Sequence, residues 1–148
     1  MSQLDGFFSL RTPRDLAEKL ERDFVRLGSA EPTSKDAQYA AFDFFVCAEH
    51  LADWVKNESG GSLTQLRSYR YGALVSHVAN GAKHFTVDPD RHTEVNDTFV
   101  QTGAFQGNAF QNNAFQTPRL VIRLEDGTTV SVLDVAQAVL VHWQASVT

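Results

Sequence analysis

The sequence predicts an α+β domain with a four-helix bundle-like core and a small antiparallel β-hairpin or sheet inserted before the last helix. Three observations predict this fold class. Apolar residues recur every three or four positions over most of residues 12–85 and again over residues 135–147, as on the buried face of a helix. Leu120, Ile122 and Leu124 alternate with their neighbours, as in a half-buried strand. The Asp126-Gly127 pair that follows is a strong signal for a two-residue hairpin turn.

The composition limits the class of protein. The chain has 148 residues, which suits one domain with its own core. Its formal net charge of −5 argues against a nonspecific nucleic-acid binder, which would be basic. Cys47 is the only cysteine, so no intramolecular disulfide can form. The first ten residues lack the basic start of a signal peptide, and no apolar run approaches the roughly 20 residues of a membrane span. We therefore expect a cytoplasmic protein without membrane contact.

The first two helices have clear start signals. Thr12-Pro13 is a typical N-cap followed by proline at the first helical position, and this helix should end at Gly28. Ser34 should cap a second helix that runs to about Asn57. The second helix is apolar on more than one face, which predicts that it lies at the centre of the bundle.

A third helix is predicted over residues 63–85. Arg70, His77 and His84 recur every seven residues along it and therefore share one side. Gly72 and Gly81 each cost about 1 kcal/mol relative to alanine inside a helix. Because Gly81 follows a polar residue, we expect a close backbone approach there, at a polar site.

The chain forms one domain, 1–148, with three parts. Residues 1–85 are the helical part with the polar site, residues 86–118 are a polar loop, and residues 119–148 are the hairpin plus the C-terminal helix. The loop repeats Ala-Phe-Gln at 104–106, 109–111 and 114–116. We expect this repeat to bind a protein partner or to mediate self-association. An isolated hairpin is marginally stable, so a third strand is expected from residues 98–101.

Ionisable residues inside the second and third helices mark the candidate site. Glu49, His50 and Asp53 lie on the second helix, and Asn80 and His84 lie on the third. Buried polar groups are normally hydrogen-bonded, so one interpretation is a structural network that joins these two sets. The other interpretation is a binding site to which His77 and Lys83 would also contribute. Neither helix has the histidine spacing of a metal site, so we expect no metal and no cofactor.

The Asn80-x-x-x-His84 spacing resembles the motif of the HEPN superfamily of small helical bundles. That motif has an arginine, a polar residue that is often Asn, a few further residues and a histidine on one helix. The resemblance covers about residues 34–85. Many members of the superfamily are metal-independent ribonucleases, often in toxin–antitoxin or phage-defence systems. This chain keeps the Asn and the His but has Ala79 at the arginine position. A second alignment, from Arg70 to His77, places Tyr71 at the polar position.

Three functions follow from these features. The leading one is an interaction or regulatory module with a HEPN-like core, because the missing arginine predicts loss of catalysis. The second is a HEPN-type endoribonuclease that binds RNA, with His84 as general acid and base, Asn80 orienting, and Arg70 or Lys83 as the cation that stabilises charge on phosphate. The third is a phage-derived structural protein that assembles through its Ala-Phe-Gln repeat.

Overall fold

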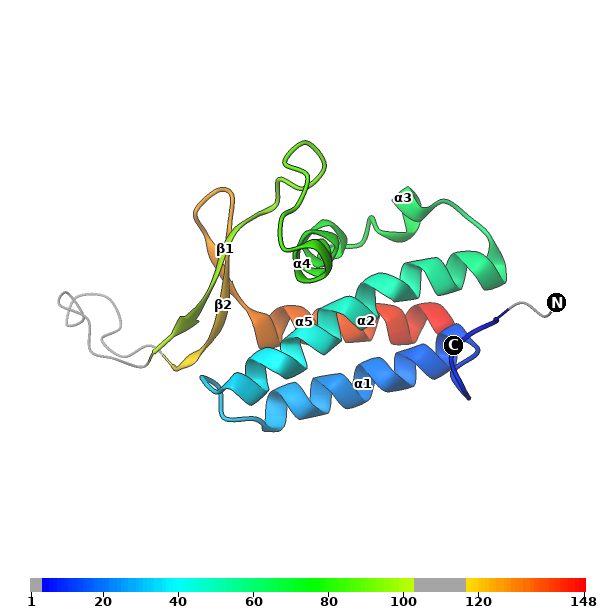
Figure 1. The fold of residues 1–148 in the computed structure, drawn as a ribbon, viewed down its shortest axis with the longest axis horizontal. Helices are drawn as coiled ribbons and strands as arrows, with labels where there is room; N and C mark the ends of the chain where they lie inside the picture. Colours follow the sequence, from blue (N-terminus) through cyan, green and yellow to red (C-terminus); the bar gives the residue numbers. More distant parts are fainter. Residues whose placement is uncertain (1–3, 103–116) are drawn as a thin grey trace.

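The fold is described from a computed structural model, which covers residues 4–102 and 117–148. The helices are α1 (Pro13–Ser29), α2 (Lys35–Ser59), α3 (Leu63–Leu66), α4 (Gly72–His84) and α5 (Val132–Val147), and the strands are β1 (Val95–Gln101), β2 (Arg119–Leu124) and β3 (Thr129–Ser131). This arrangement confirms the predicted α+β class with a small sheet before the last helix (Figure 1). The Ala-Phe-Gln repeat lies outside the described residues.

The predicted starts of α1 and α2 are confirmed, and local hydrogen bonds explain both. The Thr12 hydroxyl accepts from the main-chain N–H of Asp15 at 3.1 Å, and the Asp15 carboxylate accepts from the N–H of Thr12 at 3.0 Å. This reciprocal pair is a capping box, which satisfies N–H groups that have no partner in the first turn. At α2 the Ser34 hydroxyl accepts from the N–H of Ala37 at 3.1 Å.

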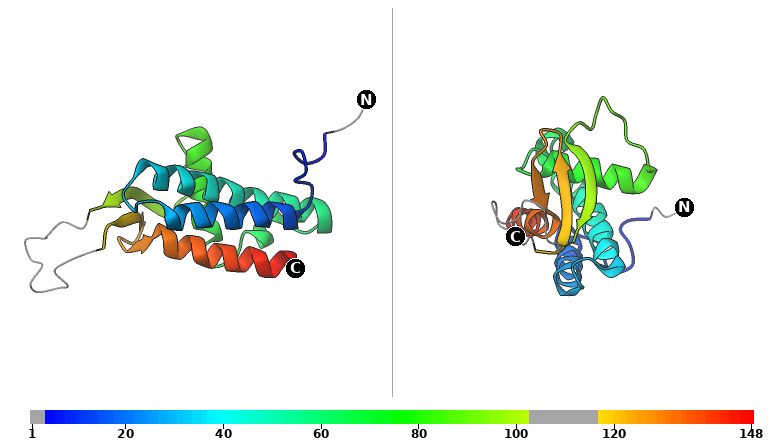
Figure 2. Two further views of the ribbon diagram at one scale, coloured as in Figure 1. Left: turned by 90° about the horizontal axis from the view of Figure 1, so that it is seen from below. Right: turned by 90° about the vertical axis from the view of Figure 1, so that its left-hand side faces the viewer.

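Helix α2 is the central helix of the bundle, as its sequence predicts. It lies beside α1 and α5, and α4 crosses it (Figures 1 and 2). Its buried residues cover more than one side of the helix: Ala37, Ala40, Ala41, Phe44, Phe45, Cys47, Ala48, Leu51 and Ala52. Fully burying a large apolar side chain such as Phe44 contributes about 1.5–3 kcal/mol. Within the described parts of the chain, no helix is long and apolar enough to cross a bilayer.

The sheet stands at the end of the bundle where α1 ends and α2 begins (Figure 1). Its strand order is β1-β2-β3, and both pairs are antiparallel. The hairpin is at the predicted position, but its loop has three residues rather than the expected two: Leu124 and Thr128 close it around Glu125, Asp126 and Gly127, and Gly127 has a φ of 88°. The expected third strand is β1, which pairs with β2 and contains a register shift between Val95 and Asp97. Helix α5 starts immediately after β3 and packs against β2, so the sheet is joined to the core.

The predicted third helix over residues 63–85 is wrong as one continuous element. The chain forms the single turn α3, leaves helical geometry over residues 67–71, and starts again as α4 at Gly72. A turn bond from the N–H of Gly72 to the carbonyl of Tyr69, 2.8 Å long, closes this connection. The main chain of Arg67 then lies where a side chain on residue 72 would be, so glycine is required there.

The predicted close approach at Gly81 is also wrong. A Cβ atom on residue 81 would meet only Cγ1 of Val87, at 3.7 Å, which is an ordinary contact. The position borders an apolar cavity rather than the polar site. The close backbone approach on this helix is at Gly72 instead.

Candidate functional site

An open groove of about 660 Å³ lies between α2, α4 and residues 91–94, and we call it the charged groove. Among the described residues, its lining includes three cations and three carboxylates: Arg67, Lys83, Arg91, Glu49, Asp53 and Glu94. His50, Asn80 and His92 also line it. The formal charges of the groove therefore balance when its histidines are neutral.

Glu49 and Arg67 form the centre of the charged groove. The hydroxyl of Ser76, on α4, donates to Oε2 of Glu49 at 2.7 Å. Nε of Arg67 lies 2.8 Å from Oε1 of the same carboxylate, and a terminal guanidinium nitrogen lies 3.7 Å from Oδ2 of Asp53. The Nε–H of Arg67 does not point at an acceptor, so its contact with Glu49 is an ion pair rather than a hydrogen bond. Both oxygens of Glu49 are thus engaged.

The environment of Glu49 acts on its protonation in two directions. The side chain is only 12% exposed, and burial raises the pKa of Glu49 above its usual value. The hydrogen bond from Ser76 and the charge of Arg67 lower the pKa, but they are smaller effects than burial. Because loss of either partner would leave a poorly solvated carboxylate, we regard the three residues as one structural unit.

The structure brings five of the predicted site residues together in the charged groove. Glu49 lies at the centre, and His50, Asp53 and Lys83 are exposed around it, with Asn80 half-buried on α4. The sequence predicted hydrogen bonds from Glu49, His50 or Asp53 to Asn80 or His84, and these partners are wrong. The side-chain amide of Asn80 donates to the carbonyl of Ser76 on its own helix, at 2.8 Å, and Glu49 is bound one turn earlier on α4.

The other three predicted residues lie elsewhere. His84 is exposed at the last residue of α4 and does not line the groove. Arg70 lies in the connection before α4, where its guanidinium is 4.9 Å from the ring centre of Tyr71. Arg70, His77 and His84 are seven residues apart, so they would share one side only on a continuous helix. The break before Gly72 removes that alignment.

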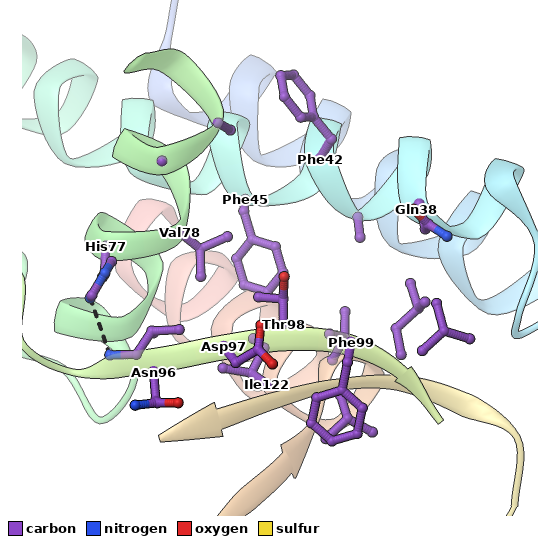
Figure 3. Close-up of a pocket in the computed structure, with 18 of the residues that line it drawn as sticks. Gln38, Phe42, Phe45, His77, Val78, Asn96, Asp97, Thr98, Phe99 and Ile122 are labelled. Carbon is purple, nitrogen blue, oxygen red and sulfur yellow. Dashed lines mark hydrogen bonds between the residues drawn. The ribbon is translucent and has the colours of Figure 1, made fainter. Parts of the chain in front are cut away.

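His77 faces the sheet rather than the charged groove. Its Nδ1 accepts a hydrogen bond from the main-chain N–H of Val95, the first residue of β1, at 3.1 Å (Figure 3, dashed line). The ring of His92 lies 5.5 Å away, centre to centre. Burial lowers the pKa of His77, and His92 adds to this shift. His77 thus joins α4 to the sheet in its neutral form, because a protonated ring could not accept this bond.

A second cavity, of about 560 Å³, lies on the other side of α4, and we call it the apolar cleft. Helices α2 and α4 form one wall, and β1 and β2 form the other. Figure 3 shows Phe45 reaching from α2 towards β1, with Val78 beside it and Ile122 on the opposite wall. No local pattern in the sequence predicted this cleft, because its residues come from five separate elements: α2, α4, β1, β2 and the first residue of α5.

Sequence reasoning also missed Arg67, Ser76, Arg91 and Glu94 in the charged groove. No local pattern distinguishes Arg67 from other surface arginines, since the turn that places it is closed by contacts five residues further on. Within the described residues, no three His, Cys, Asp or Glu side chains gather closely enough to hold a metal ion. Comparison with known proteins gives no match to a family model, a curated protein or a solved structure. The site is therefore interpreted from its geometry.

Proposed function

We propose that this chain is a non-catalytic interaction module with a HEPN-like helical core. Its charged groove would bind a segment of a partner protein that carries both positive and negative side chains. The observation that carries the proposal is the balance of charge in the groove, where three cations and three carboxylates line one open surface among the described residues. Electrostatic complementarity of this kind selects a partner and fixes its register.

A polypeptide suits this groove better than RNA does. A phosphate backbone presents negative charge alone, so it would meet Glu49, Asp53 and Glu94 as well as the cations. The whole chain carries a net charge of −5, which further weakens attraction to a polyanion. A protein segment can offer lysine or arginine to the carboxylates and acidic residues to Lys83 and Arg91.

The same geometry favours binding over the ribonuclease alternative. In the ribonuclease expected from the sequence, His84 would act beside a cation that stabilises charge on phosphate. His84 is exposed outside the groove, and Arg67, one of the cations of the groove, is engaged with Glu49. The HEPN-like part of the proposal is supported by Asn80 and His84 on one helix of a small bundle.

Two experiments test the proposal, and the first addresses catalysis. A fluorescent single-stranded RNA is incubated with the wild-type protein and with His84→Ala. We expect no cleavage by either protein. Cleavage by the wild type that is lost in His84→Ala would overturn the proposal in favour of the ribonuclease.

The second experiment addresses binding. A photo-reactive phenylalanine derivative is placed at position 50, in the groove, and at position 137, an exposed site on α5 that serves as the matched control. After irradiation in cells, a protein adduct is expected at position 50 and not at 137. Replacing Lys83 and Arg91 by glutamate should lower the yield of the adduct at position 50 roughly tenfold, which corresponds to a loss of about 1.4 kcal/mol of binding free energy. An adduct that is insensitive to these charges would contradict binding in the groove.

The assembly alternative and an oligomeric state concern residues 104–116, outside the described residues. Deletion of that segment tests them independently of the groove.

A further inference from the structure

The outer edge of β1 faces the apolar cleft. Residues 95–100 all line this cavity, although successive side chains of a strand point to opposite faces. If only one face of the strand lined the cleft, only every second residue would contribute to the lining. Six consecutive residues therefore mean that β1 presents its edge, including its main chain. β1 is an edge strand, because the sheet order is β1-β2-β3.

The strand register identifies the main-chain groups on that edge. The N–H of Leu124 donates to the carbonyl of Thr128, so Leu124 points its main chain towards β3. Main-chain direction alternates along a strand, so Ile122 and Leu120 also point towards β3. Their partners on β1, Thr98 and Val100, must then direct their N–H and C=O groups away from β2 and towards the cleft.

The protein already uses this edge at its first position. Val95 pairs with Leu124, and its outward N–H is bound by His77 from α4. Within residues 4–102 and 117–148, no main-chain partner is found for the outward groups of Thr98 and Val100. An edge with unpaired N–H and C=O groups is a template for another strand.

The surroundings of the edge define the chemistry of that strand. Phe45 and Val78 supply an apolar wall, and Phe85 at the border of the cleft is 96% exposed. Asp97 lines the cleft, where it is 3.9 Å from a guanidinium nitrogen of Arg123, and Asp88 and Asp90 follow Val87 at its border. Apolar side chains at every second position, together with basic residues, would complement both features.

We propose that the apolar cleft binds an extended peptide segment of another protein, which adds as a fourth strand to β1. Its main chain would pair with Thr98 and Val100, alternate apolar side chains would enter the cleft, and its basic residues would face Asp88, Asp90 and Asp97. This mode is β-strand addition, in which main-chain hydrogen bonds give affinity and the side-chain pocket gives specificity. The site is on the other side of α4 from the charged groove and does not depend on the function proposed for that groove.

The test uses the full-length chain and a random dodecapeptide phage library. Selected peptides are expected to be basic, with apolar residues at alternate positions. A fluorescein-labelled peptide from the selection is then titrated by fluorescence anisotropy. Thr98→Pro removes an outward N–H without removing a bond to β2, and we expect it to weaken binding at least tenfold.

The matched control is Thr129→Pro on β3, the opposite edge of the sheet. Thr129 pairs with Arg123, whose main chain points towards β1, so its own N–H also points outward. This variant should bind the peptide as the wild type does. An amide NMR spectrum confirms that both proline variants are folded. Equal affinities of Thr98→Pro and wild type would overturn the proposal.

A second variant keeps the test decisive if Thr98→Pro does not fold. Ala82 lines the cleft, and Ala82→Trp should occupy it and abolish peptide binding, whereas Ala145→Trp on the exposed side of α5 should not. Unchanged binding to Ala82→Trp would overturn the proposal. A wild-type dimer that dissociates in Thr98→Pro would also overturn the proposal, because the occupant of the cleft would then be a second copy of this chain. If the peptide binds only after deletion of residues 104–116, that segment is the occupant of the cleft in the full chain, and the proposal is overturned.

Discussion

The main chain of Arg67 occupies the space that a side chain on Gly72 would need. This relationship ends α3, turns the chain and starts α4. It also places the Arg67 guanidinium against Glu49, so the turn and the charged groove depend on one another.

Gly72→Ala should therefore destabilise the fold by about 2–4 kcal/mol, in the range of overpacking and backbone strain. The measurement is the urea midpoint of unfolding. Gly81→Ala is the matched control, because a methyl group there meets only Val87 at 3.7 Å and alanine is the better helix former by about 1 kcal/mol. It should raise the midpoint. Similar midpoints for the two variants would contradict the assigned role of Gly72.

Ser76→Ala should cost about 1–3 kcal/mol, because Glu49 loses a hydrogen bond in a poorly solvated position. His84→Ala should change stability by less than about 0.5 kcal/mol, because His84 is exposed. Denaturant midpoints of both variants check the pair. If His84→Ala lowered the denaturant midpoint and Ser76→Ala did not, His84 rather than Ser76 would belong to the structural network expected from the sequence.

The bond between His77 and Val95 predicts a pH dependence of stability. Burial lowers the pKa of His77 from its ordinary 6.5, and His92 adds to this, whereas Glu94 and Glu125 oppose it. The unfolded chain then binds the proton more readily, so this contribution is complete above about pH 6.5 and is lost as the pH falls through the folded-state pKa.

His77→Gln should accordingly show a smaller loss of stability than the wild type between about pH 7.5 and pH 5. Urea midpoints across this range measure the difference, and His92 and His142 remain in both proteins as a common background. The Val95 amide resonance should titrate with the His77 ring in the wild type only. Parallel pH profiles for the two proteins would rule out this role of His77.

Deletion of residues 104–116 should leave the helical core folded and should abolish partner binding or self-association through the Ala-Phe-Gln repeat. The described residues on either side of that segment already share one buried cluster, from Leu16 to Trp143. Light scattering reports association, and a thermal melt reports folding. A deletion variant that is unfolded would show that the repeat is needed for the core, and the assembly interpretation would be abandoned.

Elements with local sequence signals could be predicted from the amino-acid sequence. The Thr12 and Ser34 caps each act within three residues, so both helix starts could be predicted from spacing. The position of the hairpin was also predicted, although its loop has three residues rather than two. The position of α2 at the centre followed from its apolar residues on several faces. The concentration of polar residues on α2 and α4 also pointed to the correct region for the charged groove.

Contacts between distant side chains depend on how the helices and strands pack. Ser76 and Glu49 are 27 residues apart, and Val95 and His77 are 18 apart, so neither contact has a signal in local periodicity. Because the helix is broken before Gly72, Arg70 does not share a side with His77 and His84, and Arg67 lines the groove instead. The apolar cleft and the open edge of β1 arise where the sheet meets the bundle, because that junction is set by how whole elements pack rather than by any one segment.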